Sequence, residues 1–177
     1  MEKEKLSRFI SLVLRHKPET IGITLDNNGW AQTEELLKGI SKTRYIDMTI
    51  LEDIVATDNK QRYSFNEDKT KIRANQGHSV SVNIDFEEVK PDFVLYHGTA
   101  EKYIDSILST GLQPRTRQYV HLSKDIETAT KVGARHGKPV ILEINTKEMI
   151  KDNIKIFKSK NGVYLTSSVS IKYIKRI

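Results

Sequence analysis

Apolar positions in the first third of the chain recur with the spacing of amphipathic helices. In the first such stretch they stand at i, i+3, i+4 and i+7, namely at Leu6, Phe9, Ile10 and Val13. This spacing predicts a helix over residues 3–16 with one apolar stripe. Pro18 ends that helix, because the residue before a proline is kept out of the helical region. Arg15 and His16 therefore lie at its C-terminus, where cations also complement the helix dipole.

Two further helices and a hairpin are predicted next. Thr33 can cap a helix over residues 33–40, and a third helix spans residues 47–57. In the stretch YSFNEDKTKIRANQG, two short β-prone runs flank a turn at residues 66–69. Three helices followed by a hairpin is the element order of a winged-helix domain, a relative of the helix-turn-helix. The return strand of the hairpin carries Arg73.

An acidic stretch with little apolar patterning separates this part from the rest. Residues 80–92 contain four carboxylates and Pro91. We place a domain boundary near residue 90, which divides the chain into residues 1–90 and residues 91–177. Neither an internal repeat nor a low-complexity tract is present in the sequence.

Short apolar runs alternate with helical stretches in the second part. The run VLYHGT predicts a strand that ends at His97, Gly98 and Thr99, and Thr99 can also cap the helix that follows. The run YVHLS predicts a strand that ends at His121 and Ser123. A capped helix is expected at residues 125–137 and a short helix at residues 146–152. Further strands are expected at PVILEI, IKIFKS, GVYLTS and IKYIKRI. The fold class is therefore α+β, with a mixed α/β second domain.

Composition excludes several classes of protein. The chain has no cysteine, so disulfides, thiolate metal sites and cysteine nucleophiles are excluded. Its five histidines lack the spacing of a metal site, and we expect no metal. No apolar run approaches the ~20 residues that span a bilayer, and the N-terminus does not resemble a signal peptide. We expect a soluble, cytoplasmic protein without a membrane partner. The net charge of +6 suits a polyanionic partner without identifying it.

Basic side chains stand at the ends of the predicted elements. They are Arg15, His16, Arg73, His78, His97, Arg115, Arg117 and His121. Guanidinium groups bind phosphate oxygens in a bidentate manner, and histidine can donate to a phosphate or carry a proton near neutral pH. Taken singly, each is more simply explained as a solvated or structural side chain. Together they favour a phosphate-binding cleft between the two domains.

The same segments resemble, in order, the tRNA 2′-phosphotransferase (KptA) family. The similar segments are LSRFISLVLRHKPETIGITLDNNGWAQTEELL, KIRANQGHSV, LYHGT, GLQPRTRQYVHLS and NGVYLTSSV. The resemblance covers nearly the whole chain. It implies an N-terminal winged-helix lobe that binds RNA and a C-terminal lobe of the ADP-ribosyltransferase kind that binds NAD⁺ as a co-substrate.

The resemblance also implies a reaction in two steps. The internal 2′-phosphate of an RNA, possibly a tRNA at a splice junction, attacks the ribose carbon that bears nicotinamide. The ADP-ribosylated RNA 2′-phosphate then reacts with the neighbouring ribose hydroxyl. RNA with a plain 2′-OH and ADP-ribose 1″,2″-cyclic phosphate are released, and nicotinamide has already left.

The family motifs assign roles to nine residues. The catalytic basic set corresponds to Arg15, His16, Arg73 and Arg117. The three arginines would hold the transferred phosphate, and the histidine would donate a hydrogen bond or carry a proton. The NAD⁺-binding strand ends correspond to His97, Gly98, Thr99, His121 and Ser123.

Two positions depart from related patterns. Tyr119 stands where the family often has a histidine just before V-H-L-S, which could alter contact with the RNA. Val163 occupies the position at which many ADP-ribosyltransferases carry a catalytic glutamate. An apolar residue is consistent with a phosphate nucleophile that is already anionic. Arg115 matches a position that is usually apolar in the family and is the weaker candidate.

Two alternatives remain at this stage. One is an ADP-ribosyltransferase that modifies a terminal phosphate of RNA or DNA and stops after one step. The other is a winged-helix nucleic-acid-binding protein with a non-catalytic second domain. We expect the chain to act as a monomer, and the sequence does not identify the physiological RNA.

Overall fold

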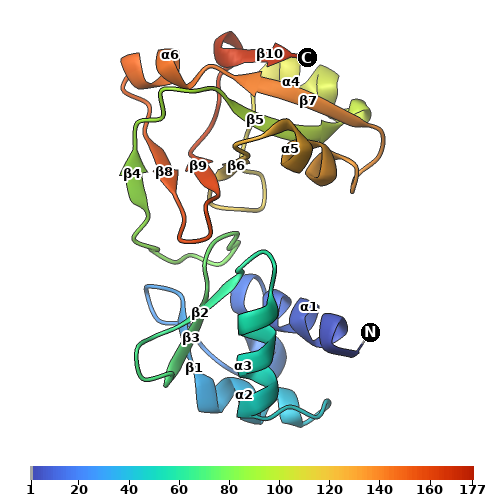
Figure 1. The fold of residues 1–177 in the computed structure, drawn as a ribbon, viewed down its shortest axis with the longest axis vertical. Coiled ribbons are helices and arrows are strands. Elements are labelled where there is room, and N and C mark those ends of the chain that lie inside the picture. The colour runs from blue at the N-terminus through green and yellow to red at the C-terminus, as the bar shows by residue number, and fades with distance from the viewer. Residues whose placement is uncertain (1) are drawn as a thin grey trace. The chain divides into compact units, whose positions relative to one another are not determined.

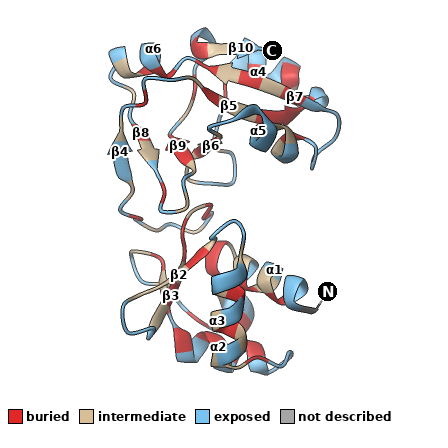
Figure 2. Ribbon diagram, in the orientation of Figure 1, coloured by how far each residue is buried: buried red, intermediate tan, exposed pale blue. Residues whose placement is uncertain are grey.

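The computed structural model describes residues 2–177 and is a mixed α/β structure with several small antiparallel sheets (Figure 1). The chain forms two compact units, one that ends at Asp85 and one that spans Phe86–Ile177. Each unit has its own hydrophobic core, drawn in red in Figure 2. The two units are described separately below as the first unit and the second unit.

The first unit contains the three expected helices and the expected hairpin. Its elements are α1 (Glu2–Arg15), the 3₁₀ turn η1 (Pro18–Ile21), β1 (Trp30–Gln32), α2 (Thr33–Ser41), α3 (Met48–Thr57), β2 (Tyr63–Phe65) and β3 (Lys71–Ala74). The strands form an antiparallel sheet in the order β1-β3-β2. The apolar stripe of α1 is buried, with Ile10, Val13 and Leu14 fully enclosed, so the helical spacing in the sequence identifies the core face correctly.

The predicted capping role of Thr33 is wrong. Its hydroxyl donates to the carbonyl oxygen of Lys69 at 2.9 Å, and its N–H donates to that of Thr70 at 2.8 Å. Gln32 is the N-cap residue of α2 and makes no side-chain capping bond. The buried threonine therefore ties α2 to the hairpin turn, because a tertiary acceptor satisfies its hydroxyl in place of the helix end.

The second unit has two antiparallel sheets and three short helices. Its elements are β4 (Glu87–Val89), β5 (Leu95–Ala100), η2 (Glu101–Tyr103), α4 (Ile104–Thr110), β6 (Val120–Leu122), α5 (Ile126–Gly133), β7 (Pro139–Ile144), α6 (Thr146–Lys151), β8 (Ile156–Lys158), β9 (Tyr164–Thr166), η3 (Ile171–Tyr173) and β10 (Ile174–Arg176). One sheet has the order β10-β7-β5 and the other has the order β4-β8-β9-β6. The sequence pattern did not predict β4, which is short and mostly exposed and lies at a sheet edge.

Two backbone hydrogen bonds join β5 to the end of β6. The N–H of Tyr96 donates to the carbonyl oxygen of Ser123 at 2.8 Å, and the N–H of Ser123 donates to that of Tyr96 at 2.7 Å. This bridge places the start of β5 beside the end of β6. The residues on either side of it are those that the family motifs assign to NAD⁺.

The second predicted threonine cap is also wrong. Thr99 lies inside β5, where it pairs with Val140 of β7 and is buried. The strand continues to Ala100, and the 3₁₀ turn η2 delays the helix until Ile104. Gly111 does end this helix with φ of 77°, as a C-terminal glycine is expected to do.

Helix α5 packs directly on the backbone of β5 through two glycines. A Cβ atom on Gly98 would lie 1.7 Å from the carbonyl oxygen of Ala129, and one on Gly133 would lie 2.6 Å from that of Thr99. Neither distance is compatible with a side chain. The glycines therefore allow a close contact between helix and strand that any larger residue would force apart.

We predict that Gly98→Ala destabilises the protein by more than about 3 kcal/mol, because backbone atoms block the added methyl group. Gly162→Ala is the control: φ is 78° at this glycine and no atom lies within 4 Å of an added Cβ, so only about 1 kcal/mol of backbone strain is expected. Urea unfolding followed by circular dichroism gives both values. Equal, small losses would contradict the close contact between α5 and β5.

Candidate functional site

In the first unit, the loop after β3 folds over the C-terminus of α1. The carbonyl oxygen of Arg15, the last residue of the helix, accepts hydrogen bonds from the N–H groups of Ser79 at 2.9 Å and Val80 at 3.4 Å. The last carbonyls of a helix have no partner within the helix, so this loop satisfies one of them. Arg15 is thereby buried, with 9% of its surface exposed.

The same loop fixes His16. The hydroxyl of Ser79 lies 2.9 Å from Nδ1 of the imidazole. Gly77 makes the turn with φ of 89°, and a Cβ atom there would lie 3.6 Å from Cζ of Arg15. A glycine and a serine in one turn therefore hold the backbone close to the guanidinium and the imidazole at the helix end.

His78 lies in the centre of this cationic group. It is 2% exposed, and its Nε2 has no hydrogen-bond partner among residues 2–177. Burial, together with the positive charges of Arg15, His16 and Arg73, lowers the pKa of His78 from 6.5 to about 4. The imidazole is therefore neutral at pH 7.

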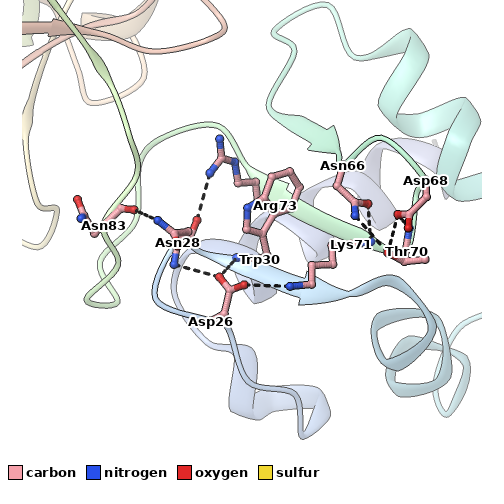
Figure 3. Close-up of polar contacts among 9 residues, drawn as sticks. All are labelled: Asp26, Asn28, Trp30, Asn66, Asp68, Thr70, Lys71, Arg73 and Asn83. Carbon is pink, nitrogen blue, oxygen red and sulfur yellow. Dashed lines mark hydrogen bonds and ion pairs between the residues drawn. The ribbon is translucent and has the colours of Figure 1, made fainter.

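Arg73 projects from β3 onto Trp30 of the neighbouring strand (Figure 3). Its Cζ lies 4.4 Å from the centre of the indole ring, and its Nη1 donates to the carbonyl oxygen of Asn28 at 3.4 Å. Its Nε is buried without a hydrogen-bond partner among the described residues 2–177. Burial lowers the pKa of Arg73, and the charges of Asp85 and Asp26 partly oppose this effect.

Three of the four predicted catalytic residues therefore belong to one group in the first unit. They are Arg15, His16 and Arg73, and the charges of all three act on the pKa of His78. We call these three residues the basic cluster. Basic side chains gathered in this way are suited to bind an anion, and guanidinium groups suit phosphate.

In the second unit, two histidines flank the bridge between β5 and β6. Nδ1 of His97 lies 3.0 Å from the carbonyl oxygen of His121, and Nδ1 of His121 lies 3.0 Å from that of Tyr119. A carbonyl oxygen only accepts, so each Nδ1 carries the proton. Burial is the main cause that lowers the pKa of His97, and Arg117 adds to it, while the bond to His121 opposes the shift.

The other residues predicted to bind NAD⁺ have clear packing roles. Gly98 allows the contact with α5, Thr99 is buried in the sheet, and Ser123 makes the backbone bridge to Tyr96. Gly98 and Thr99 are buried, whereas Ser123 is half-exposed. His97, His121 and Ser123 are brought together by the strand bridge.

The loop before β6 holds the remaining predicted arginines. Arg117 is exposed, and its N–H donates to the carbonyl oxygen of Pro114 at 3.0 Å. Surrounding protein and the charge of Arg135 lower its pKa. Arg115 has φ of 56°, and its Cζ lies 5.1 Å from the centre of the Tyr103 ring. Its guanidinium therefore stacks on this ring, and we do not assign it the phosphate-binding role of Arg117.

Tyr119 and Val163 have structural partners in the second unit. The ring of Tyr119 packs edge-on against Phe86 at 5.6 Å and Phe157 at 6.0 Å. The N–H of Val163 donates to the hydroxyl of Ser159 at 3.0 Å in the turn between β8 and β9. Tyr119 is therefore part of an aromatic cluster.

Two features are absent from the described residues 2–177. No group of three or more histidine, cysteine, aspartate or glutamate side chains could hold a metal ion there. No helix in this part of the chain is long and apolar enough to cross a membrane.

Comparison with known proteins agrees with the resemblance seen in the sequence. The model of the family described as RNA 2′-phosphotransferase, Tpt1 / KptA family, matches residues 1–168. The chain belongs to this family.

Its similar relatives include three proteins named probable RNA 2′-phosphotransferase. The protein of Fusobacterium nucleatum subsp. nucleatum is 60% identical over 97% of both chains. The protein of Flavobacterium johnsoniae is 49% identical over 97% of this chain and 94% of its own. That of Escherichia coli O9:H4 (strain HS) is 49% identical over 95% of this chain and 92% of its own.

We predict that His78 makes stability depend on pH. Its pKa is lower in the folded state, so the unfolded state binds more protons between pH 6.5 and pH 4. The free energy of unfolding is therefore greatest above pH 6.5 and falls by roughly 3 kcal/mol as the pH approaches 4. His78→Gln should remove this component, whereas His136→Gln, at an exposed histidine, should keep it. Urea unfolding at pH 4.5 to 8 measures it; identical pH profiles for all three proteins would contradict the prediction.

Proposed function

We propose that this protein is an NAD-dependent RNA 2′-phosphotransferase that removes an internal 2′-phosphate from RNA. The observation that carries the proposal is the basic cluster, Arg15, His16 and Arg73, gathered around the buried, neutral His78. A dianionic phosphate suits such a cluster. Membership of the RNA 2′-phosphotransferase family supports the same substrate.

In the proposed reaction the RNA 2′-phosphate is first ADP-ribosylated and then released from the RNA. NAD⁺ supplies an electrophilic ribose carbon and nicotinamide as a neutral leaving group. In the second step a ribose hydroxyl attacks phosphorus, the bond to the RNA 2′-oxygen breaks, and the hydroxyl proton passes to that oxygen. The products are RNA with a 2′-OH and ADP-ribose 1″,2″-cyclic phosphate.

The basic residues have distinct roles in this proposal. Arg15 and Arg73 hold the phosphate oxygens and stabilise the charge that develops on them in the second step. Arg117, in the second unit, is the third arginine that the family motifs assign to the phosphate. His16, oriented through Nδ1 by Ser79, donates to the phosphate or carries the proton of the second step.

The second unit is proposed to bind NAD⁺. The donor set at the bridge between β5 and β6 fits such a ligand, because His97, His121 and Ser123 offer imidazole and hydroxyl groups beside a sheet edge. Ribose hydroxyls, an amide and a pyrophosphate can all be bound by these groups and by backbone N–H groups. Gly98 and Thr99 would contribute through their backbone.

We also propose a fold family for each of the two units. The order of three helices and a hairpin in the first unit favours a winged-helix domain that binds RNA. Two small antiparallel sheets bridged between β5 and β6 favour an ADP-ribosyltransferase-like domain in the second unit. The physiological substrate class that the family resemblance implies is a tRNA with a 2′-phosphate at a splice junction.

We predict that nicotinamide is released from NAD⁺ only when an RNA with a 2′-phosphate is present. Arg15→Ala, Arg73→Ala and Arg117→Ala should each lower turnover by about 100-fold or more, because each removes a preorganised charge from the reacting phosphate. Arg8→Ala, at an exposed position on α1, is the matched control and should keep full turnover. Rates of nicotinamide release with 2′-phosphate and 2′-OH RNA give the comparison.

Different results would support the other readings. Stable ADP-ribosylated nucleic acid as the final product would indicate a one-step ADP-ribosyltransferase. Folded protein that binds RNA but never consumes NAD⁺ would indicate a binding protein. Full turnover by Arg73→Ala would contradict the role of the basic cluster.

A further inference from the structure

The support beneath Arg73 comes from a residue outside the catalytic set. Trp30 pairs with Arg73 across β1 and β3, so their side chains lie on the same face of the sheet. The indole ring lies under the guanidinium, with 4.4 Å between Cζ and the ring centre. In Figure 3 the arginine side chain lies across the Trp30 ring and extends toward Asn28.

The turn before β1 holds Trp30 in place. Oδ1 of Asp26 accepts hydrogen bonds from the N–H groups of Asn28 at 3.0 Å and Trp30 at 2.9 Å. The N–H of Asp26 donates to the carbonyl oxygen of Trp30 at 2.8 Å. Lys71 lies 3.4 Å from Oδ2 of Asp26 and partly balances its charge. The backbone of the tryptophan is thus fixed on both sides.

A second support for Arg73 is the carbonyl oxygen of Asn28. This residue is anchored in turn, because its Nδ2 donates to the carbonyl oxygen of Asn83 at 2.9 Å. The N–H of Asn83 donates to the carbonyl oxygen of Asn27 at 2.7 Å. The acceptor of Arg73 is therefore held by the segment that follows the His78 loop, as the dashed lines in Figure 3 show.

Stacking holds a guanidinium without using its donors. A carboxylate partner would occupy two N–H groups, whereas an aromatic ring contacts the face of the guanidinium and leaves the N–H groups at its edge available. Within residues 2–177, Arg73 makes a long hydrogen bond to Asn28 and no salt bridge. Its orientation therefore depends on the ring.

We propose that Trp30 is a positioning residue for the reaction: it orients the Arg73 guanidinium so that its edge binds the RNA 2′-phosphate. This inference rests on the proposed function and names a residue on which that function depends. Trp30 itself touches neither the phosphate nor NAD⁺. Its action is through Arg73 alone.

The chain offers a direct reporter of this contact. Trp30 is the only tryptophan among the 177 residues. Its fluorescence therefore comes from the ring beneath Arg73 and from no other site. A phosphate that binds the guanidinium changes the charge above the indole ring and should shift or quench the emission.

The test is a titration without NAD⁺, using a short RNA with one internal 2′-phosphate and the same RNA with a 2′-OH. In the wild-type protein the 2′-phosphate RNA should change Trp30 emission, and the 2′-OH RNA should not do so at the same concentration. Arg73→Lys keeps a charge but loses the planar group, so this change in emission should largely disappear. Dye-labelled versions of both RNAs give affinities for variants that lack tryptophan.

Two replacements of the ring are compared with a control. Trp30→Leu should weaken binding of the 2′-phosphate RNA by about tenfold and leave the 2′-OH RNA unchanged, since a desolvated cation–π contact is of that size. Trp30→Phe keeps an aromatic face and should lie within about threefold of the wild type. Tyr45→Leu makes a similar change at a ring that is 81% exposed and should have no effect.

The outcomes separate this inference from the proposed function. If wild-type protein prefers the 2′-phosphate RNA and Trp30→Leu keeps the full preference, the positioning role is wrong while the phosphotransferase proposal stands. If wild-type protein has no such preference, both are wrong. If Trp30→Leu does not fold, Trp30→Phe and Arg73→Lys still test the positioning role. That role is wrong if wild-type protein binds the 2′-phosphate RNA tightly without any change in Trp30 emission.

Discussion

Like-charge repulsion at the C-terminus of α1 is the constraint on which the candidate site depends. Arg15, His16 and Arg73 all raise the local positive potential, and His78 lies among them. A protonated His78 would add a fourth cation in a buried position. Burial in the loop after Gly77 keeps it neutral, so no fourth buried charge is added to the basic cluster.

The protein holds this basic cluster in part by backbone hydrogen bonds and by aromatic stacking. The loop after β3 satisfies the helix end through the backbone of Ser79, and Trp30 supports Arg73 by stacking. Nε2 of His78 and Nε of Arg73 are buried without a hydrogen-bond partner among residues 2–177. Binding sites commonly carry an energetic cost of this kind.

Local patterns predicted the elements, and long-range pairing decided the contacts. The period of α1 and Pro18 placed Arg15 and His16 at a helix end, and the hairpin pattern placed Arg73 on its return strand. The sequence could not show that Trp30 pairs with Arg73, because that register joins strands more than 40 residues apart. The predictions that Thr33 and Thr99 cap helices were wrong for the same reason. The hydroxyl of Thr33 bonds to the hairpin and the backbone of Thr99 pairs in a sheet, and local propensity does not predict such long-range contacts.

The central claim is that the RNA 2′-phosphate is transferred to NAD⁺. It is tested most directly by measuring the mass of the product that carries the phosphate. The protein is incubated with NAD⁺ and a short RNA that bears one internal 2′-phosphate. We predict that the RNA loses this phosphate and that the phosphate is recovered on ADP-ribose as a cyclic ester, with one nicotinamide per phosphate. Recovery as inorganic phosphate, or RNA that keeps its phosphate in the presence of folded protein, would contradict the account.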